Sequence, residues 1–282
     1  MTFLALWAER EAAIEKSEEK VVNIAKHLTH QQTAMIGETE QLTRFLANTI
    51  AAEPNLPDTC PSYFYQIQEL YTNVANIGVV DDKGNLICVT NGIVKNVSIS
   101  DRQYFKNAIA NKSFSIGYFQ YDRSIQAPSV NFAHPIIDKQ EKLKGVVVTV
   151  IALDWWSAAL DKAEFPMGSN AVIADSNGLV LASYPNSLLP LGEKINNKHF
   201  LHSDSSLAMF KDDNNVNQIF HRATIYNDIN NNNLEIYITS PTDKYINRAN
   251  KHFLETIILF FSAILIIAFI GHHLIKKSIF YP

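Results

Sequence analysis

The chain has 282 residues, which is enough for one or two domains of about 100–200 residues each. Hydrophobic residues make up 47% of it and charged residues 18%, a balance that excludes a disordered chain and leaves ample apolar material for a core. The net charge of -4 argues against nucleic acid as a partner, and two cysteines are too few for a disulfide scaffold or a four-cysteine zinc site.

The first residues, MTFLALW, are apolar, and charged residues follow from Glu9. This stretch is too short to span a bilayer, and a signal peptide would need a basic start and a longer apolar run. We expect residues 1–7 to be the remnant of a first transmembrane helix, with a frayed helix start as the alternative.

A long stalk helix is expected over residues 8–53, because this stretch contains no proline and Gly37 is its only glycine. Apolar residues recur in it at heptad intervals: Ile14, Val21, Leu28, Met35 and Leu42. Such a stripe packs either on the helix's own domain alone or also on a second copy of the chain, and the spacing fits both equally. As the partner we expect a second copy, giving a homodimer.

Two β-hairpins with the same D-x-x-G turn are predicted at residues 76–90 and 171–183. Matching hairpins at domain-scale spacing suggest two related modules in tandem. We place the first module at residues 54–160 and the second at 161–242.

The predicted fold class is α+β, with an antiparallel sheet and a few helices in each module. The proline-rich stretch 54–61 should end the stalk helix, and the asparagine-rich stretch 227–233 should form a turn. A short helix is expected near 102–111, and the remaining strands at 115–120, 129–135, 145–153, 218–226 and 234–239.

A transmembrane helix is expected at residues 253–275, after a connector at 243–252. The run TIILFFSAILIIAFIG is apolar on all sides and carries no charge, which disfavours a buried core helix. Lys276 and Lys277 follow it, but basic residues also precede it, so the charges leave its orientation open. Residues 276–282 are expected to begin a cytoplasmic linker.

A candidate ligand site begins at the segment SISDRQYFKNAIAN, residues 98–111. Ser100 and Gln103 fit a capping box, which would place Arg102 and Tyr104 beside the first turn of a helix. An arginine there could bind a carboxylate, and free N–H groups at the helix start favour an anion. The candidate binding residues are Arg102, Tyr104, Phe105, Tyr118, Tyr121, Arg123, Asn131 and His134.

Each of these residues also has an ordinary structural interpretation. Arg102 could pair with Asp101, Tyr104 and Phe105 could be core aromatics, and the others could be loop or sheet residues. The sequence contains no known catalytic motif and no metal-ligand spacing, so we expect a binding protein without a cofactor or a metal rather than an enzyme. Cys60 and Cys88 are expected to form a disulfide, with two buried free thiols as the alternative.

The order of helix, two sheet modules and membrane helix resembles a double Cache (PAS-like) extracytoplasmic sensor domain over residues 8–277. The most specific stretches are SDRQYF, SIGYFQYDRS, PSVNFAHPIID and KGVVVTVIALD. They are most similar to Cache domains at the front of bacterial diguanylate cyclases. Residues 278–282 resemble the entry into a HAMP linker or output module, and the cysteines fall where many such domains have a pair.

The resemblance implies a receptor in the bacterial inner membrane, with residues 8–252 in the periplasm and a ligand in the membrane-distal module. Family members that bind amino acids use an arginine and two aromatics, which match Arg102, Tyr104 and Phe105. Their amine-binding aspartate corresponds to Val150, so we expect an organic acid rather than an amino acid. The output is expected to be cyclic-di-GMP synthesis. The alternatives are a chemotaxis receptor, a histidine kinase or a membrane-anchored interaction protein without a ligand.

Overall fold

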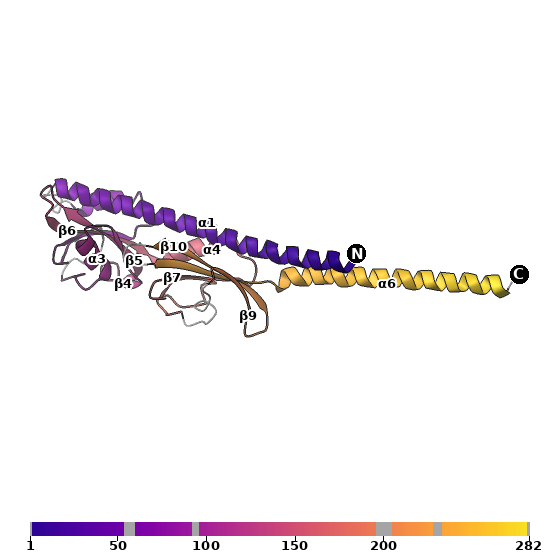
Figure 1. The fold of residues 1–282 in the computed structure, drawn as a ribbon. Coiled ribbons are helices and arrows are strands. Elements are labelled where there is room, and N and C mark those ends of the chain that lie inside the picture. Colours follow the sequence, from indigo (N-terminus) through magenta and orange to yellow (C-terminus); the bar gives the residue numbers. More distant parts are fainter. Residues whose placement is uncertain (1, 54–59, 92–95, 196–204, 228–232, 281–282) are drawn as a thin grey trace. The chain divides into compact units, whose positions relative to one another are not determined.

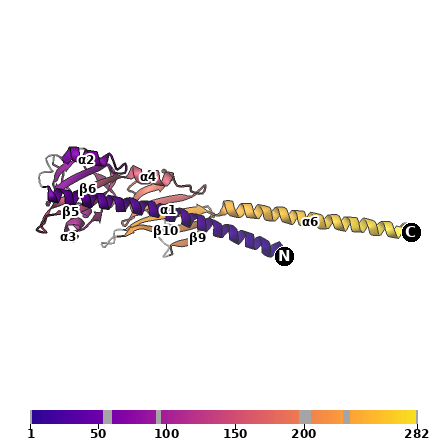
Figure 2. The ribbon, with the colours of Figure 1, turned by 90° about the horizontal axis from the view of Figure 1, so that it is seen from above.

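The computed structural model describes residues 2–53, 60–91, 96–195, 205–227 and 233–280. The fold is α+β: a long N-terminal helix, two antiparallel sheets and a C-terminal apolar helix (Figures 1 and 2). Residues 21–210 and 219–240 form one compact unit that contains most of both sheets. Most of the proline-rich break (54–59) and most of the asparagine-rich turn (228–232) lie outside the described residues.

The first helix, α1, spans Thr2–Ala52 and confirms the predicted long helix. From Val21 onward its apolar stripe is buried in the main core of the compact unit. Two threonines of the same helix bond to both sheets: the hydroxyls of Thr43 and Thr149 lie 2.8 Å apart, and Thr33 donates to the Ile225 carbonyl over 2.7 Å. The stripe therefore packs on the helix's own domain, and its pairing with a second copy stays a prediction.

The first sheet has the strand order β2-β1-β6-β5-β3, with β4 paired to β5, and all its pairings are antiparallel. It is accompanied by α2 and α3. In chain order the bounds are α2 Cys60–Gln68, β1 Asn76–Asp81, β2 Leu86–Val89, α3 Gln103–Asn111, β3 Ser115–Ile116, β4 Gln120–Asp122, β5 Ala127–Ile137 and β6 Leu143–Ala152.

The two faces of the first sheet belong to different cores. Along β6, Val147 and Ile151 join the core that contains α1, whereas Val148 and Val150 join the core that contains α3. Successive side chains on a strand point to opposite faces, so β6 is apolar without interruption because both of its faces are covered. This arrangement places the α3 side of the sheet, and the site described below, opposite α1.

The second sheet follows α4 (Leu153–Asp161) and has the order β8-β7-β11-β10-β9. Its bounds are β7 Asn170–Asp175, β8 Val180–Tyr184, β9 Leu207–Lys211, β10 Asn217–Asn227 and β11 Asn233–Pro241. The strands predicted at 218–226 and 234–239 are confirmed, whereas α2, α4 and β9 were not predicted. The single strand predicted at 115–120 is wrong, because β3 and β4 are separate short strands.

Both D-x-x-G hairpins are confirmed, and they have the same geometry. Asp81 Oδ1 accepts from the N–H groups of the residues two and four positions on, and Asp175 Oδ1 does the same. Gly84 and Gly178 close the two turns at φ of +86° and +75°, a region in which a side chain is strained. The sequence pattern therefore encoded the turn directly.

The last helix, α6, spans Asp243–Phe280. Its segment Phe253–His272 has a mean hydropathy of 2.7, and its central window has no side chains buried inside the protein. A helix of 20 residues at about 1.5 Å per residue is as long as the hydrocarbon core of a bilayer is thick. Its length and composition thus fit a membrane span.

Candidate functional site

A small cavity lies between α3 and the first sheet, and its volume is about 30 Å³. One end of it is apolar, formed by valine, leucine and isoleucine side chains of β1, β2, β6 and the segment before α3. The other end is polar. Its lining residues are Asn76, Gly78, Val80, Leu86, Val89, Val97, Ile99, Tyr104, Asp122, Arg123, Ser124, Asn131, Val148 and Val150.

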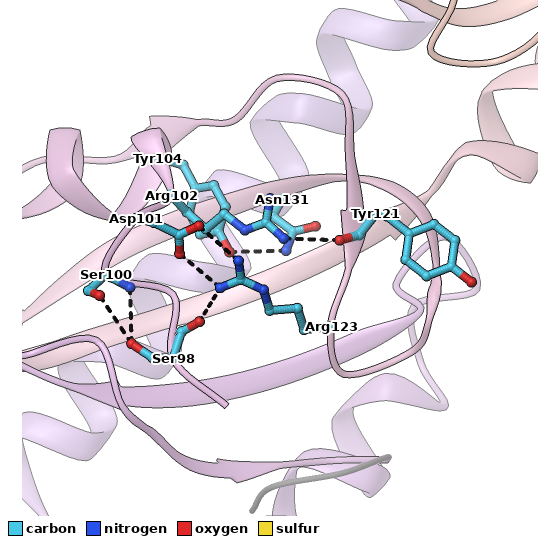
Figure 3. Close-up of polar contacts among 8 residues, drawn as sticks. All are labelled: Ser98, Ser100, Asp101, Arg102, Tyr104, Tyr121, Arg123 and Asn131. Carbon is cyan, nitrogen blue, oxygen red and sulfur yellow. Dashed lines mark hydrogen bonds and ion pairs between the residues drawn. The ribbon is translucent and has the colours of Figure 1, made fainter. Parts of the chain in front are cut away.

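A buried hydrogen-bond network forms the polar end of this cavity. Asn131 donates to the Tyr104 hydroxyl over 3.3 Å (Figure 3). It also donates to Asp122 Oδ2 over 2.7 Å. The side-chain oxygen Oδ1 of Asn131 accepts a hydrogen bond from the Ser129 hydroxyl, 2.7 Å away. The other Asp122 oxygen accepts from the Ser124 hydroxyl over 2.6 Å and from the backbone N–H groups of residues 124 and 125. An almost buried carboxylate is thus held in place by four donors.

Tyr104 forms the helix side of the network and is almost fully buried. Burial raises the pKa of Tyr104 to about 12, so its hydroxyl stays neutral near neutral pH. A Cβ on Gly117 would lie 2.8 Å from Cδ1 of the Tyr104 ring, so the backbone approaches the ring more closely than a side chain would allow. Gly117 therefore fixes the position of Tyr104.

Two arginines lie at and beside the edge of the cavity. Arg123 makes a two-pronged ion pair with Asp101, both contacts at 2.8 Å, and also donates to the Ser98 carbonyl (Figure 3). The hydrogen bonds from Arg123 hold the pKa of the Asp101 carboxyl below its usual range. Arg102 donates to the Tyr121 carbonyl over 3.1 Å. Because Arg123 and Asp101 are 42% and 57% exposed, an incoming anion could compete for this arginine.

The predicted capping box is wrong. Helix α3 begins at Gln103, and its N-cap residue is Arg102, which makes no side-chain cap hydrogen bond. Ser100 instead packs against the turn glycine Gly84, and its hydroxyl accepts from Ser98. The segment before α3 is thus held by the first hairpin, and Arg102 still lies beside the first helical turn.

The structure brings Tyr104, Arg123 and Asn131 together at the cavity, with Arg102 adjacent to it. Phe105 is buried in the apolar core between α3 and the sheet. Tyr118 is half-buried and Tyr121 is 58% exposed, and neither of their side chains is among those lining the cavity.

His134 lies on the other face of the sheet. It is three residues from Asn131 along β5, and this odd spacing puts the two side chains on opposite faces. Burial lowers the pKa of His134, and the charges of Arg44 and Glu40 on α1 also act on it. The structure therefore groups His134 with α1 rather than with the cavity.

Sequence reasoning missed Asp122, Ser124 and Asn76, which also line the polar end. A signal for Asp122 was available, because the strand β4 alternates buried Gln120, exposed Tyr121 and buried Asp122. Choosing Tyr121 instead of the next residue is an error of one position in the strand register, whereas Arg123 does line the cavity.

Cys88 takes part in a disulfide. The sequence has one other cysteine, Cys60, and its side chain lies outside the described part of the structure. The predicted Cys60–Cys88 pairing therefore stays a prediction. Within the described residues, no group of three or more histidine, cysteine or acidic side chains could hold a metal ion.

The chain belongs to the Cache domain family, because the Cache domain model (dCache_1) matches residues 8–249. Such domains are non-catalytic, extracellular sensor domains of membrane receptors. The curated proteins include no significant match to the chain.

Several solved structures share the fold. One is the ligand-binding domain of the Pseudomonas fluorescens chemoreceptor CtaA in complex with L-isoleucine. Its sequence is 14% identical and its TM-score is 0.66, and the match covers 85% of this chain and 98% of that domain. The ligand-binding domain of the Campylobacter jejuni chemoreceptor Tlp3 with L-valine is also 14% identical, with a TM-score of 0.67 and coverages of 84% and 97%. The extracellular domain of rpHK1S-Z16, designated as a histidine kinase, is 16% identical with a TM-score of 0.70 and coverages of 82% and 96%.

Proposed function

We propose that the chain is the ligand-sensing region of a bacterial membrane receptor, and that its ligand binds at the cavity between α3 and the first sheet. The observation that carries this proposal is the buried Tyr104–Asn131–Asp122 network, which places polar groups at one end of an otherwise apolar cavity. Small-molecule sites typically combine apolar walls with a few precisely placed polar groups. At about 30 Å³ this cavity is the size of a water molecule, so the proposal requires the cavity to widen when the ligand binds. In this cavity the polar groups come from α3, β4 and β5, so a bound ligand can move these elements relative to one another.

The charges around the cavity favour a zwitterionic ligand. Arg102 and Arg123 supply two positive charges, and Asp101 and Asp122 supply two negative ones. A ligand carboxylate can replace the exposed carboxylate of Asp101 on Arg123, and an ammonium can pair with Asp122.

The preference for an organic acid depended on Val150, which does line the cavity, but Asp122 lines it too. The preference for an organic acid stays a prediction, and we propose an α-amino acid as the more favoured ligand. Structural neighbours are named as complexes with L-isoleucine, L-arginine and L-valine, which supports this order.

For the receptor as a whole, we propose that residues 54–160 are the membrane-distal module and 161–242 the membrane-proximal one. The segment 253–275 crosses the inner membrane, residues 8–252 lie in the periplasm, and two copies pair. The neighbours are named as chemoreceptors and a histidine kinase, which favours one of these outputs over the diguanylate cyclase expected from the sequence resemblance. The coding sequence downstream of Pro282 tests the output directly.

The ligand proposal is tested by calorimetry on the full chain in lipid nanodiscs, with the twenty amino acids and a series of organic acids as titrants. The matched variants are Asp122→Asn and Asp138→Asn. Asp138 accepts the same kind of backbone hydrogen bonds in an exposed turn and does not line the cavity. If an amino acid binds, Asp122→Asn should weaken it about 10–100-fold, the loss expected for one charge-assisted hydrogen bond. Asp138→Asn should leave the affinity unchanged.

One outcome would support the organic acid predicted from the sequence instead. In that outcome an organic acid binds more tightly than every amino acid, and Asp122→Asn leaves its affinity unchanged or improves it. Absence of binding by either class would count against the sensor proposal. The interaction protein without a ligand would then be the better interpretation.

A further inference from the structure

A second and larger cavity, which we call the α1–α4 groove, shares no lining residue with the site above. Its volume is about 520 Å³, within the usual range of about 300–1,000 Å³ for small-molecule sites. Helices α1 and α4 form its two walls and lie next to each other in Figures 1 and 2. The lining residues are His27, Leu28, Gln31, Gln32, Ala34, Met35, Glu38, Thr72, Asn73, Trp155, Ala158, Ala159, Lys162 and Ala163.

The groove exists because small side chains separate the helices. Ala34 on α1 and Ala158 and Ala159 on α4 all line the groove, and none of these methyl groups can fill the space between two helix backbones. Leu28 and Met35 are buried and form an apolar floor. This shape alone would suit any apolar group, so specificity has to come from the polar groups in the groove.

Gln32 lies just beneath the floor and can supply such a polar group once its side chain turns toward the groove, because its amide atoms have no accessible surface in this structure. It is 0% exposed, lies between Leu28 and Met35 on α1, and has no hydrogen-bond partner for either Nε2 or Oε1 among the described residues. A buried amide with neither bond made is costly, at about 1–3 kcal/mol for each group, and it is rare in native proteins. The amide of Gln32 therefore lacks a partner that offers an acceptor and a donor side by side.

The chemistry of that partner is restricted. A cation offers donors only, and a carboxylate offers acceptors only, so neither can satisfy both atoms of the Gln32 amide. The charged residues lining the groove, Glu38 and Lys162, have opposite signs and therefore favour an occupant without net charge. An amide held in the cis form by a ring presents C=O and N–H on one edge and can make both bonds to Gln32 at once. Its ring would lie against Met35 and the half-buried Trp155.

We propose that the α1–α4 groove is a second ligand site, which binds a small neutral molecule with a planar cyclic amide through the side chain of Gln32. This inference does not depend on the sensor function proposed above, because the two cavities share no lining residue. A ligand here would touch α1 and α4 directly, and α1 bonds to both sheets.

The probe for the test is 2-quinolone, and N-methyl-2-quinolone is its matched control because it retains the carbonyl but lacks the N–H. Both are titrated into the full chain in nanodiscs, with empty nanodiscs as the reference for partition into lipid. We expect saturable binding of 2-quinolone and about tenfold weaker binding of the N-methyl compound, the factor that corresponds to one hydrogen bond.

The variant Gln32→Leu should weaken 2-quinolone about tenfold and remove its advantage over the N-methyl compound. Gln41→Leu is the matched control, since Gln41 is exposed on the same helix and does not line the groove. Should Gln32→Leu fail to fold, Ala159→Leu fills the groove without touching the amide and should also abolish binding. Asp122→Asn should leave 2-quinolone binding unchanged, which separates this site from the first.

Three results would overturn the inference. One is that 2-quinolone shows no saturable binding. Another is that Gln32→Leu binds both compounds as the wild type does. The third is a change in particle mass in Gln32→Leu but not in Gln41→Leu, which would identify a second copy of the chain as the occupant.

Discussion

The substitution Gly192→Ala tests a contact that joins the two sheets. Gly192 has a φ of +76°, and a Cβ there would lie 2.4 Å from Cζ and 2.5 Å from Cε1 of Phe119. The Phe119 N–H donates to Asp175 Oδ2 over 2.9 Å. Phe119 lies between β3 and β4 of the first sheet, whereas Asp175 ends β7 of the second, so the added methyl group would displace a link between them.

The cost follows from three contributions. Alanine at positive φ loses about 1–2 kcal/mol. Moving the half-buried Phe119 ring forfeits roughly half of the 1.5–3 kcal/mol that full burial contributes. The hydrogen bond to Asp175 adds at most about 1 kcal/mol. Together these give a loss of about 2–4 kcal/mol in the free energy of unfolding, or a Tm lower by roughly 5–12 °C.

Gly178→Ala is the matched control for this experiment. Its φ is +75°, but the nearest atom to its Cβ would be Lys194 Cγ at 3.9 Å, an ordinary contact. It should lose only the backbone contribution of about 1–2 kcal/mol. Thermal unfolding followed by tryptophan fluorescence measures both, and equal losses of Tm would refute the reasoning. In a Phe119→Ala background, the cost of Gly192→Ala should fall to that of Gly178→Ala.

Three further predictions concern stability. Asn131→Ala leaves buried atoms of Asp122 and Tyr104 without their donor, and urea unfolding should show a loss of about 3 kcal/mol. Burial lowers the pKa of His134, because the folded protein favours the neutral imidazole. The contribution of His134 to the free energy of unfolding should therefore be complete above about pH 6.5 and be lost as the pH falls through the lowered pKa. His134→Gln should therefore flatten the acid decrease in Tm. Cys88→Ser should cost about 2–4 kcal/mol and make the Tm insensitive to reductant, whereas a wild-type Tm unaffected by reductant would contradict this.

The sequence predicted best those features that depend on a few neighbouring residues. Each D-x-x-G hairpin combines an aspartate that accepts backbone N–H bonds with a glycine at positive φ, and both requirements are visible in four residues. The burial of α1 was equally accessible, because its heptad stripe extends over many turns. The stripe itself does not distinguish the sheets from a second chain as the surface it covers.

The exact start of α3 and the presence of α4 were harder to predict, because neither helix has the usual capping signal at its first residue. Helix α4 begins after Ala152 and α3 after Arg102, and neither N-cap residue makes a side-chain cap hydrogen bond. Ser100 offered the expected cap chemistry but is used in the turn next to Gly84 instead. The short helix predicted near 102–111 is therefore confirmed as α3, but tertiary contacts determine its exact start, and no local pattern signalled α4.

The site depends on long-range register in the same way. Asp122 and Asn131 meet because β4 pairs with β5 from Gln120 to Asp122, and that pairing places both side chains on the α3 face. The candidates Asn131 and His134 were close in sequence, yet the alternation of β5 separates them by the thickness of the sheet. Residue type identified the polar candidates, but only the strand register selects those that face the cavity.

The segment from Gly117 to Ser124 is where a ligand could influence both sheets. Asp122 lines the cavity, and Phe119, on the same segment, bonds to Asp175 of the second sheet. Among the described strands β4 pairs with β5 alone, over three residue pairs, so this segment can shift at the loss of few backbone hydrogen bonds. A ligand shifts such an equilibrium only by its difference in affinity for the two positions of the segment. It follows that a ligand contacting Asp122 would act on the second sheet, whereas one held by the apolar end of the cavity alone would not.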